Sequence, residues 1–193
     1  GLPKIAGHRA GANSVDEVTE AAREMGVKVL TLYTISTENW KRPKSEIDAL
    51  FNLLEEYLEK KEAELNKNNI RLSIIGSTKE LPQSTQDKIK KVTLSTGKNT
   101  GMVLNLALNY GSRQEMVKAS RDIAREAKDG KLKIEDIDEG VFSDHLYTRE
   151  LPDPDLLIRT SGESRISNFL LWQISYAEVY ITDALWPDFR KDD

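Results

Sequence analysis

The stretch VKVLTLYTISTENWKRP, residues 27–43, decides the fold class of this chain. Its first nine residues are mainly β-branched or apolar, which predicts a buried strand over residues 27–35. After a polar loop, apolar residues recur at helical spacing from Ile47 onward, which predicts a long helix over residues 45–68. A strand that leads through a short loop into a helix is the repeating unit of an α/β protein with a parallel sheet.

The same alternation continues along the chain, without a linker, an internal repeat or a low-complexity tract. It predicts one α/β domain, residues 1–193, with a mainly parallel central sheet flanked by helices. The helix that begins at Ser112 is predicted to open with a capping box, in which Glu115 is the partner of Ser112. The other predicted strands cover residues 70–75, 102–108, 156–158 and 178–181, and the other predicted helices cover residues 14–25, 84–94 and 112–127.

The composition excludes several classes of protein. The 193 residues include 28 Lys+Arg and 32 Asp+Glu, which gives a net charge of −4, with two His and no Cys. The absence of Cys excludes disulfide frameworks, thiol nucleophiles and Cys-ligated metals, and the slight acidity argues against a nucleic-acid binder. The mean hydropathy is −0.53. No apolar run reaches the ~18 residues that span a bilayer, and no signal peptide is present, which together predict a cytoplasmic protein.

Ligands of parallel α/β sheets bind beyond the carboxyl ends of the strands, so the loops after the predicted strands are the first candidates for a site. Residues 36–43, STENWKRP, combine hydroxyl groups, a carboxylate, an amide, an indole and a guanidinium. Entry into a helix requires neither Trp40 nor Arg42. The composition therefore favours a functional loop over the alternative of helix capping alone.

The loop after the strand at 156–158 has a different character. Its sequence RTSGESRISN, residues 159–168, carries two arginines and several hydroxyl groups, which are the donors that a phosphate or diphosphate requires. The apolar run at 169–172 predicts a helix whose N-terminus would favour an anion. A solvated surface loop is the alternative. The chain contains neither G-x-G-x-x-G nor a Walker A loop, so neither NAD nor ATP is indicated as a ligand.

Four further features have open interpretations. The segment GHRAG, residues 7–11, is either an anion-binding turn or a structural turn. His145 is predicted to be a surface or packing residue. Glu178 lies in an apolar aromatic run, where it pairs with an arginine, binds a divalent cation or is exposed on a strand. The apolar stripe of residues 47–58 is predicted to be mostly core, with a surplus that could line an apolar cavity.

Five motifs occur in order along essentially the whole chain. They are GHRAG at 7–11, TLY and STENWKRP within 31–43, LALNYG at 106–111, DLLIRTSGE and RISNFLLWQ within 155–173, and LWPDF at 185–189. Together they resemble the motifs of the cis-prenyltransferases, and in particular those of the bacterial undecaprenyl diphosphate synthases.

This resemblance implies an Mg²⁺-dependent transferase that adds isopentenyl diphosphate to farnesyl diphosphate in cis. The implied product is the long-chain undecaprenyl diphosphate that serves as the carrier lipid of cell-wall assembly. The resemblance also implies a homodimer, an apolar tunnel walled in part by residues 47–58, and no nucleic-acid partner. The protein would be cytoplasmic or peripheral at the inner membrane surface, which the product would contact transiently.

The resemblance assigns roles to residues in both loops. Asn39 matches the residue linked to proton removal. A neutral amide is a very poor base, so Asn39 is expected to orient the substrate or a diphosphate oxygen that takes the proton. Glu178 matches a residue tied to Mg²⁺ and the dimer interface. The segment that would hold the isopentenyl diphosphate contains Arg159, Arg165, Ile166 and Ser167. The allylic substrate would contact Lys4, His8 and Trp40, and the rest of the substrate loop is Ser36, Thr37, Glu38 and Arg42.

The chain also departs from the family pattern. Lys4 stands where the family commonly has Arg, which keeps the charge but loses a bidentate donor. The family's first strand and its loop with a metal-binding aspartate are expected just before Gly1, and an Arg- and Gly-containing tail is expected after Asp193. Two hypotheses follow. The chain is part of an active cis-prenyltransferase, or it is a non-catalytic subunit of the same fold that binds isoprenoid diphosphates.

Overall fold

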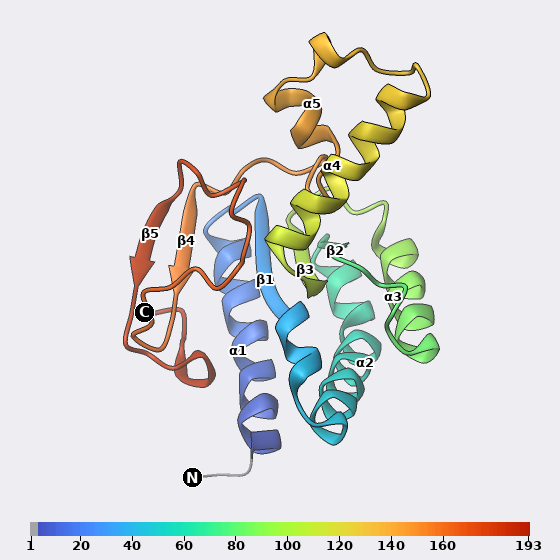
Figure 1. The fold of residues 1–193 in the computed structure, drawn as a ribbon. Coiled ribbons are helices and arrows are strands. Elements are labelled where there is room, and N and C mark those ends of the chain that lie inside the picture. Colours follow the sequence, from blue (N-terminus) through green and yellow to red (C-terminus); the bar gives the residue numbers. More distant parts are fainter. Residues whose placement is uncertain (1–3) are drawn as a thin grey trace.

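The computed structural model describes the backbone of residues 4–193 and the side chains of residue 7 and residues 11–193. Helices and strands alternate along it (Figure 1). In chain order the elements are α1 (Lys4–Glu24), β1 (Val29–Ser36), the 3₁₀ helix η1 (Thr37–Lys41), α2 (Lys44–Lys67), β2 (Arg71–Ile75), α3 (Gln83–Thr96), β3 (Val103–Tyr110), α4 (Ser112–Lys128), η2 (Ile134–Asp136), α5 (Glu139–Asp144), β4 (Leu156–Arg159), β5 (Glu178–Ile181) and η3 (Trp186–Asp188).

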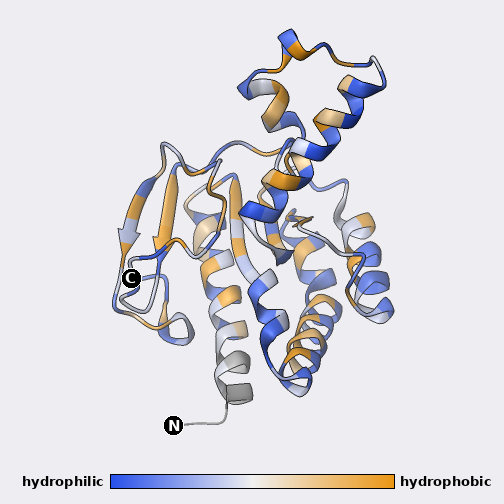
Figure 2. Cartoon of the chain, in the orientation of Figure 1, coloured by the Kyte–Doolittle hydropathy of each residue, from blue (hydrophilic) through white to orange (hydrophobic). Residues whose placement is uncertain are grey.

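The centre of the fold is a parallel sheet with the strand order β1-β3-β2. Every residue of β3 is buried, as expected for a central strand that is covered on both faces. On one face the sheet packs against α2 and α3, whose outward sides carry hydrophilic residues (Figure 2). On the other face, Ala107 and Tyr110 pack against the turns around Leu170 and Ile174. The predicted α/β class, with a parallel sheet flanked by helices, is confirmed.

The strands divide into two parallel sheets. Strands β4 and β5 pair only with each other, in a second parallel sheet. Leu157 packs against the aromatic cluster of the main sheet, whereas Leu156 and Ile158 are 51% and 43% exposed. The two sheets therefore meet through side chains and not through backbone hydrogen bonds. Apolar patterning identified these strands, but their pairing depends on hydrogen bonds between distant segments.

The apolar stripe of α2 is core, as predicted. Ile47, Phe51, Leu54 and Leu58 are all buried against the sheet and α3. The structure places a cavity of about 630 Å³ elsewhere, between α1 and α2. Its lining is mixed: it contains the charged side chains of Asp16, Glu56, Lys60 and Lys61 together with Leu53 and Tyr57. The apolar tunnel implied by the family resemblance stays a prediction.

The N-terminal helix begins ten residues earlier than predicted, because α1 starts at Lys4. Residues 7–11 are helical, so the prediction of a turn there, anion-binding or structural, is wrong. A glycine inside a helix costs only about 1 kcal/mol relative to alanine, so two glycines do not prevent the helix. At Gly11 the missing side chain has a packing role. A Cβ would lie 3.1 Å from Trp186 Cδ1, and Trp186 Nε1 donates to the Gly11 carbonyl at 3.1 Å.

A second expected helix, at residues 169–172, does not form. Ser167, Asn168 and Leu170 have φ values of 56°, 64° and 48°, which an α-helix does not permit. These turns are held by α4, since the Ser112 N–H donates to the Asn168 carbonyl at 2.8 Å and the Leu171 N–H donates to Ser112 Oγ at 2.9 Å. Hydrogen bonds across more than 50 residues thus override the local helical pattern.

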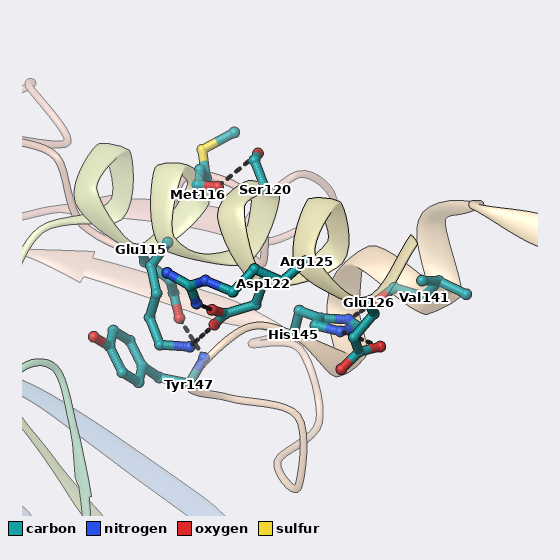
Figure 3. Close-up of polar contacts among 10 residues, drawn as sticks. Glu115, Met116, Ser120, Asp122, Arg125, Glu126, Val141, His145 and Tyr147 are labelled. Atoms are coloured by element: carbon teal, nitrogen blue, oxygen red, sulfur yellow. Dashed lines mark hydrogen bonds and ion pairs between the residues drawn. The ribbon is translucent and has the colours of Figure 1, made fainter. Parts of the chain in front are cut away.

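The capping box predicted for α4 is also wrong. Gly111, not Ser112, is the N-cap residue, and the Glu115 side chain points into the protein. Glu115 is 1% exposed, and its carboxylate accepts from the Tyr110 hydroxyl at 2.6 Å, the Tyr147 N–H at 2.7 Å and Gln173 Nε2 at 3.1 Å. Figure 3 shows the carboxylate reaching from α4 to the Tyr147 backbone. Glu115 therefore joins the end of β3 to the segments around Tyr147 and Gln173.

His145 is a packing residue, as predicted. It follows α5 and ties it to α4, which projects away from the sheet (Figure 1). Its Nδ1 lies 2.7 Å from the Val141 carbonyl oxygen, and its Nε2 lies 3.2 Å from Glu126 Oε2 (Figure 3). The hydrogen bond to Val141 and the charge of Glu126 raise the pKa of His145 above its usual value, against the opposing effect of partial burial. Asp122 adds a smaller effect in the same direction.

This pKa shift predicts a pH-dependent link between α4 and α5. A raised folded-state pKa stabilises the protein fully below the unfolded value of about 6.5, and the contribution is lost as the pH rises through the folded pKa. We expect the melting temperature of wild type to exceed that of His145→Gln by more at about pH 6 than at about pH 8.5. An equal difference at both pH values would contradict the prediction.

None of the helices that the structure describes is both long and apolar enough to cross a membrane.

Candidate functional site

The loop that follows β1 is ordered by its own side chains. The Ser36 N–H donates to Asn39 Oδ1 at 2.7 Å, which fixes the start of η1. The side-chain oxygen of Asn39 is therefore engaged within the loop, and its side-chain NH₂ group remains as a donor toward a ligand. This arrangement agrees with an orienting role for Asn39. It does not suit a base, since a neutral amide is a very poor base and the Asn39 oxygen already accepts a hydrogen bond.

Trp40 is held in one orientation at the end of η1. Its Nε1–H donates to Asn109 Oδ1 at 2.7 Å, and its ring lies 5.7 Å from the ring of Phe51 between centroids. The side chain is still 41% exposed, so an apolar surface remains available. Asn109, the penultimate residue of β3, donates in turn to Glu80 Oε2 at 2.5 Å and to the Ser77 carbonyl at 3.0 Å. Its φ of 46° is one that Asn tolerates better than most residues.

Glu38 is the acidic member of this loop. Partial burial alone would raise the pKa of its carboxyl. Hydrogen bonds from Asn168, from its own backbone and from Ser36 and Thr37 outweigh that effect and hold the pKa below its usual value. Glu38 is thus charged at neutral pH. Arg42, one of two basic residues in the loop, pairs with Glu46 at 2.6 Å. Thr37 Oγ1 donates to Glu38 Oε2 at 3.2 Å.

The segment after β4 carries the predicted diphosphate ligands. Arg159 ends β4, and its buried Nε has no hydrogen-bond partner among the described residues. Arg165 is largely exposed and pairs with Glu163 at 2.5 Å. Ile166 and Ser167 are exposed as well. An unpartnered buried donor, in the same segment as an exposed arginine and a hydroxyl group, suits an incoming anion, because a buried polar atom without a partner is costly.

The backbone of this segment is fixed by the turn after β5. The Ser161 N–H donates to the Ala184 carbonyl at 2.8 Å, and the Gly162 N–H donates to the Thr182 carbonyl at 2.9 Å. Gly162 has a φ of 62°, and a Cβ there would lie 2.8 Å from Asp183 Oδ1. A side chain at this position would therefore be strained and crowded.

The two loops meet at Asn168. Its Nδ2 donates to Glu38 Oε1 at 3.0 Å and to Gln114 Oε1 at 3.1 Å. Gly111 lies against the same contacts, because a Cβ there would be 2.7 Å from both Asn168 Nδ2 and Thr37 Oγ1. The structure thus brings the loop after β1, the start of α4 and the segment after β4 to one place, as the rule for carboxyl ends of parallel strands predicted.

Other predicted residues are not brought to this place by the described part of the chain. Glu178 pairs with Leu156, whereas Arg159 pairs with Ile181 three residues further along. Glu178 therefore lies about 10 Å from Arg159 along the strands, at the opposite edge of the small sheet. It is exposed, which matches the third of its predicted alternatives. The side chains of Lys4 and His8 lie outside the described residues, although both positions are in α1.

A resident metal site is not evident in the described residues. No group of three or more His, Cys, Asp and Glu side chains there is placed to hold a metal ion. Glu178 supplies one carboxylate, about 10 Å from Arg159 along the strands. Mg²⁺ is often bound by only one or two carboxylates together with phosphate oxygens of a substrate. The described residues therefore do not form a preformed magnesium site.

The sequence did not single out Asn109, Asn168 or Glu115 as contributors to the site. Both asparagines stand inside the family motifs. Asn109 directly follows the predicted strand at 102–108, and Asn168 ends the loop that follows the predicted strand at 156–158. These positions after predicted strands were the available signal. The sequence predicts a capping role for Glu115, because the pattern S-x-x-E from Ser112 to Glu115 fits a capping box.

Comparison with known proteins agrees with this geometry. A prenyltransferase family model described as undecaprenyl diphosphate synthase matches residues 1–193. The isoprenyl transferase of Bacillus subtilis is 54% identical over 191 residues, which are 99% of this chain and 74% of the relative. The isoprenyl transferase of Streptococcus agalactiae serotype III is 50% identical, over 99% of this chain and 78% of the relative.

Two solved structures have the same fold. Lavandulyl diphosphate synthase from Lavandula x intermedia, in complex with dimethylallyl diphosphate, superposes with a TM-score of 0.97 at 38% identity, over 100% of this chain and 83% of that chain. A probable undecaprenyl diphosphate synthase from Campylobacter jejuni superposes with a TM-score of 0.82 at 36% identity, over 95% of this chain and 84% of that chain.

Proposed function

Because this chain belongs to the undecaprenyl diphosphate synthase family of prenyltransferases, we propose that it adds isopentenyl diphosphate repeatedly to farnesyl diphosphate in cis. The proposed product is undecaprenyl diphosphate, the carrier lipid of cell-wall assembly. The magnesium requirement, the homodimer, the apolar tunnel and transient contact with the membrane surface are parts of the same proposal.

The observation that carries this proposal is the meeting of two unlike loops at one edge of the sheet. The loop after β1 offers an exposed indole face and the NH₂ group of Asn39. The segment after β4 offers two guanidinium groups, one of them with an unpartnered buried Nε. The indole face suits an apolar chain that ends in a diphosphate, and the guanidinium groups suit the diphosphate of a second, small substrate.

In the proposed reaction, the allylic C–O bond breaks and its electron pair leaves with the diphosphate. A C–C bond forms between the allylic carbon and the double bond of isopentenyl diphosphate, which then loses a proton to restore a double bond. The residues Arg159, Arg165 and Ser167 would hold the diphosphate of isopentenyl diphosphate, with Ile166 beside them. Trp40 would pack against the allylic chain.

The proton acceptor follows from the contacts of Asn39. Its amide oxygen already accepts from Ser36, so a diphosphate oxygen, oriented by the Asn39 NH₂ group, is the proposed acceptor. The loop that carries the family's metal-binding aspartate is proposed to lie upstream of Gly1. The bound Mg²⁺ would supply stabilisation of the negative charge that develops on the leaving diphosphate.

The alternative, a non-catalytic subunit that binds isoprenoid diphosphates, receives no support from the comparisons, since the relatives described above carry transferase names. The deciding experiment measures chain elongation from farnesyl and labelled isopentenyl diphosphates with Mg²⁺. The 193-residue chain is assayed beside a chain extended upstream by its own coding sequence. Long products from the extended chain support the proposal. Binding of diphosphates without product from either chain would favour the alternative.

The role of Arg165 has a separate test. Arg165→Ala removes an exposed guanidinium that forms a solvent-exposed ion pair with Glu163. We expect a rise of about 10-fold or more in KM for isopentenyl diphosphate with little change in melting temperature, since exposed ion pairs contribute little stability. Unchanged KM and kcat would remove Arg165 from the site.

A further inference from the structure

We propose that Asn168 is a positioning residue that locks the loop after β1 to the segment after β4, and so sets the distance between the two substrates. This inference rests on the proposed function, because it assigns the two loops to the two substrates of one reaction. Asn168 itself is not proposed to touch either substrate. It acts through Glu38 and through the start of α4.

The first argument is that every polar atom of the Asn168 side chain is used. One N–H of Nδ2 donates to Glu38 Oε1 at 3.0 Å and the other to Gln114 Oε1 at 3.1 Å, while Oδ1 accepts from the Arg113 N–H at 2.9 Å. The backbone carbonyl of Asn168 accepts from the Ser112 N–H at 2.8 Å. Four hydrogen bonds from one residue thus join segments that are 130 and 54 residues away in the sequence.

The second argument is the chemistry of the bond to Glu38. An amide N–H that donates to a carboxylate forms a charge-assisted hydrogen bond, which is stronger than a neutral one. Glu38 precedes Asn39 and Trp40, so this bond fixes the loop beside the residues proposed to touch the allylic substrate. Asn168 directly follows Ser167, so the same bond fixes the segment proposed to hold isopentenyl diphosphate.

The third argument is that the surrounding backbone accommodates this contact. Asn168 has a φ of 64°, a conformation that Asn and Asp adopt more readily than other residues with side chains. At Gly111 any Cβ would lie 2.7 Å from Asn168 Nδ2 and 2.3 Å from Gln114 Oε1. The absence of a side chain at Gly111 is therefore what allows the amide to reach across to Glu38.

These contacts permit a selective test with Asn168→Asp. The aspartate keeps the shape and the backbone conformation, and its oxygen still accepts from the Arg113 N–H. The Gln114 amide can turn and donate through its Nε2. Only the link to Glu38 is lost, because two carboxylates would then face each other. The double variant Asn168→Asp with Glu38→Gln restores that link with donor and acceptor exchanged.

We expect Asn168→Asp to lower kcat for elongation about 10- to 100-fold, since small misplacements of reacting groups have effects of this size. The dissociation constant for isopentenyl diphosphate alone should stay within about 2-fold, because the arginines are intact. With Glu38→Gln as the reference, the double variant should recover at least about a third of the kcat that Asn168→Asp loses. The matched control is Asn66→Asp, the same change at an amide that bonds Ser95 on the far helix α3. It should leave kcat unchanged.

Hydrogen exchange gives a readout that does not depend on activity. Asn168→Asp should speed exchange in residues 36–42 and 159–168 together, and the double variant should restore protection in both. Unchanged kcat and unchanged exchange in Asn168→Asp would overturn the inference, as would a loss of kcat that the double variant does not rescue. If wild type makes no prenyl product, the proposed function fails, and coupled exchange still decides whether Asn168 locks the two loops.

Discussion

Replacing Glu115 with leucine is expected to lower the free energy of unfolding by about 2–6 kcal/mol. The substitution removes the acceptor of the Tyr110 hydroxyl and of the Tyr147 N–H, and each buried donor left without a partner costs about 1–3 kcal/mol. Gln173 keeps its hydrogen bond to Thr148 at 2.9 Å and contributes less. Burial and the charge of Glu115 raise the pKa of Tyr110, so that hydroxyl stays protonated and needs an acceptor.

The measurement is denaturant unfolding of wild type, Glu115→Leu and Glu115→Gln. The glutamine keeps a carbonyl acceptor and should lose less stability than the leucine. The matched control is Glu135→Leu, the same change at an exposed residue of η2, which should stay within about 0.5 kcal/mol of wild type. A stability of Glu115→Leu equal to that of the control would show that the buried carboxylate does not hold these segments together.

The second large effect is expected at Arg159. We expect Arg159→Ala to lower kcat/KM for elongation about 100- to 1000-fold, the range found when a preorganised donor to a charged group is removed from an active site. Arg159 ends β4, and its buried Nε lacks a partner in the described part of the chain, so its guanidinium is available to a ligand. Lysine keeps the charge but not the fork, so Arg159→Lys should be intermediate.

The measurement is steady-state elongation kinetics with isopentenyl diphosphate varied, together with a melting curve for each variant. Arg121→Ala removes an exposed arginine from α4 and is the control for the loss of one positive charge. A loss of activity in Arg159→Ala that stays below about 3-fold, with the fold intact, would place the diphosphate elsewhere.

Much of the fold follows from local pattern. The predicted strands at 70–75 and 178–181 and the helix at 45–68 differ from β2, β5 and α2 by at most one residue at each end. Apolar spacing and turn residues act over a few neighbours, so they are visible in the sequence. The same holds for the two candidate loops, whose composition departs from that of a helix cap or a solvated surface.

Two of the errors share one physical cause. Residues 169–172 look helical, yet Ser112 and Asn168 hold them in turns. Glu115 fits a helix cap, yet the neighbouring Tyr110 hydroxyl and two donors from distant segments, on Tyr147 and Gln173, draw it inside. In each case the local preference is worth about 1 kcal/mol or less. Hydrogen bonds that exist only in the folded tertiary structure outweigh it.

The sequence by itself determined the positions of most strands and helices, the α/β class, the membership of a prenyltransferase family and the two loops that carry polar groups. Tertiary structure alone decided that β4 and β5 form a separate sheet, that Asn109 holds Trp40, and that Asn168 joins the two loops. Periodicity and composition are properties of neighbouring residues, whereas strand pairing and these side-chain bonds depend on which distant segments the folded chain places in contact.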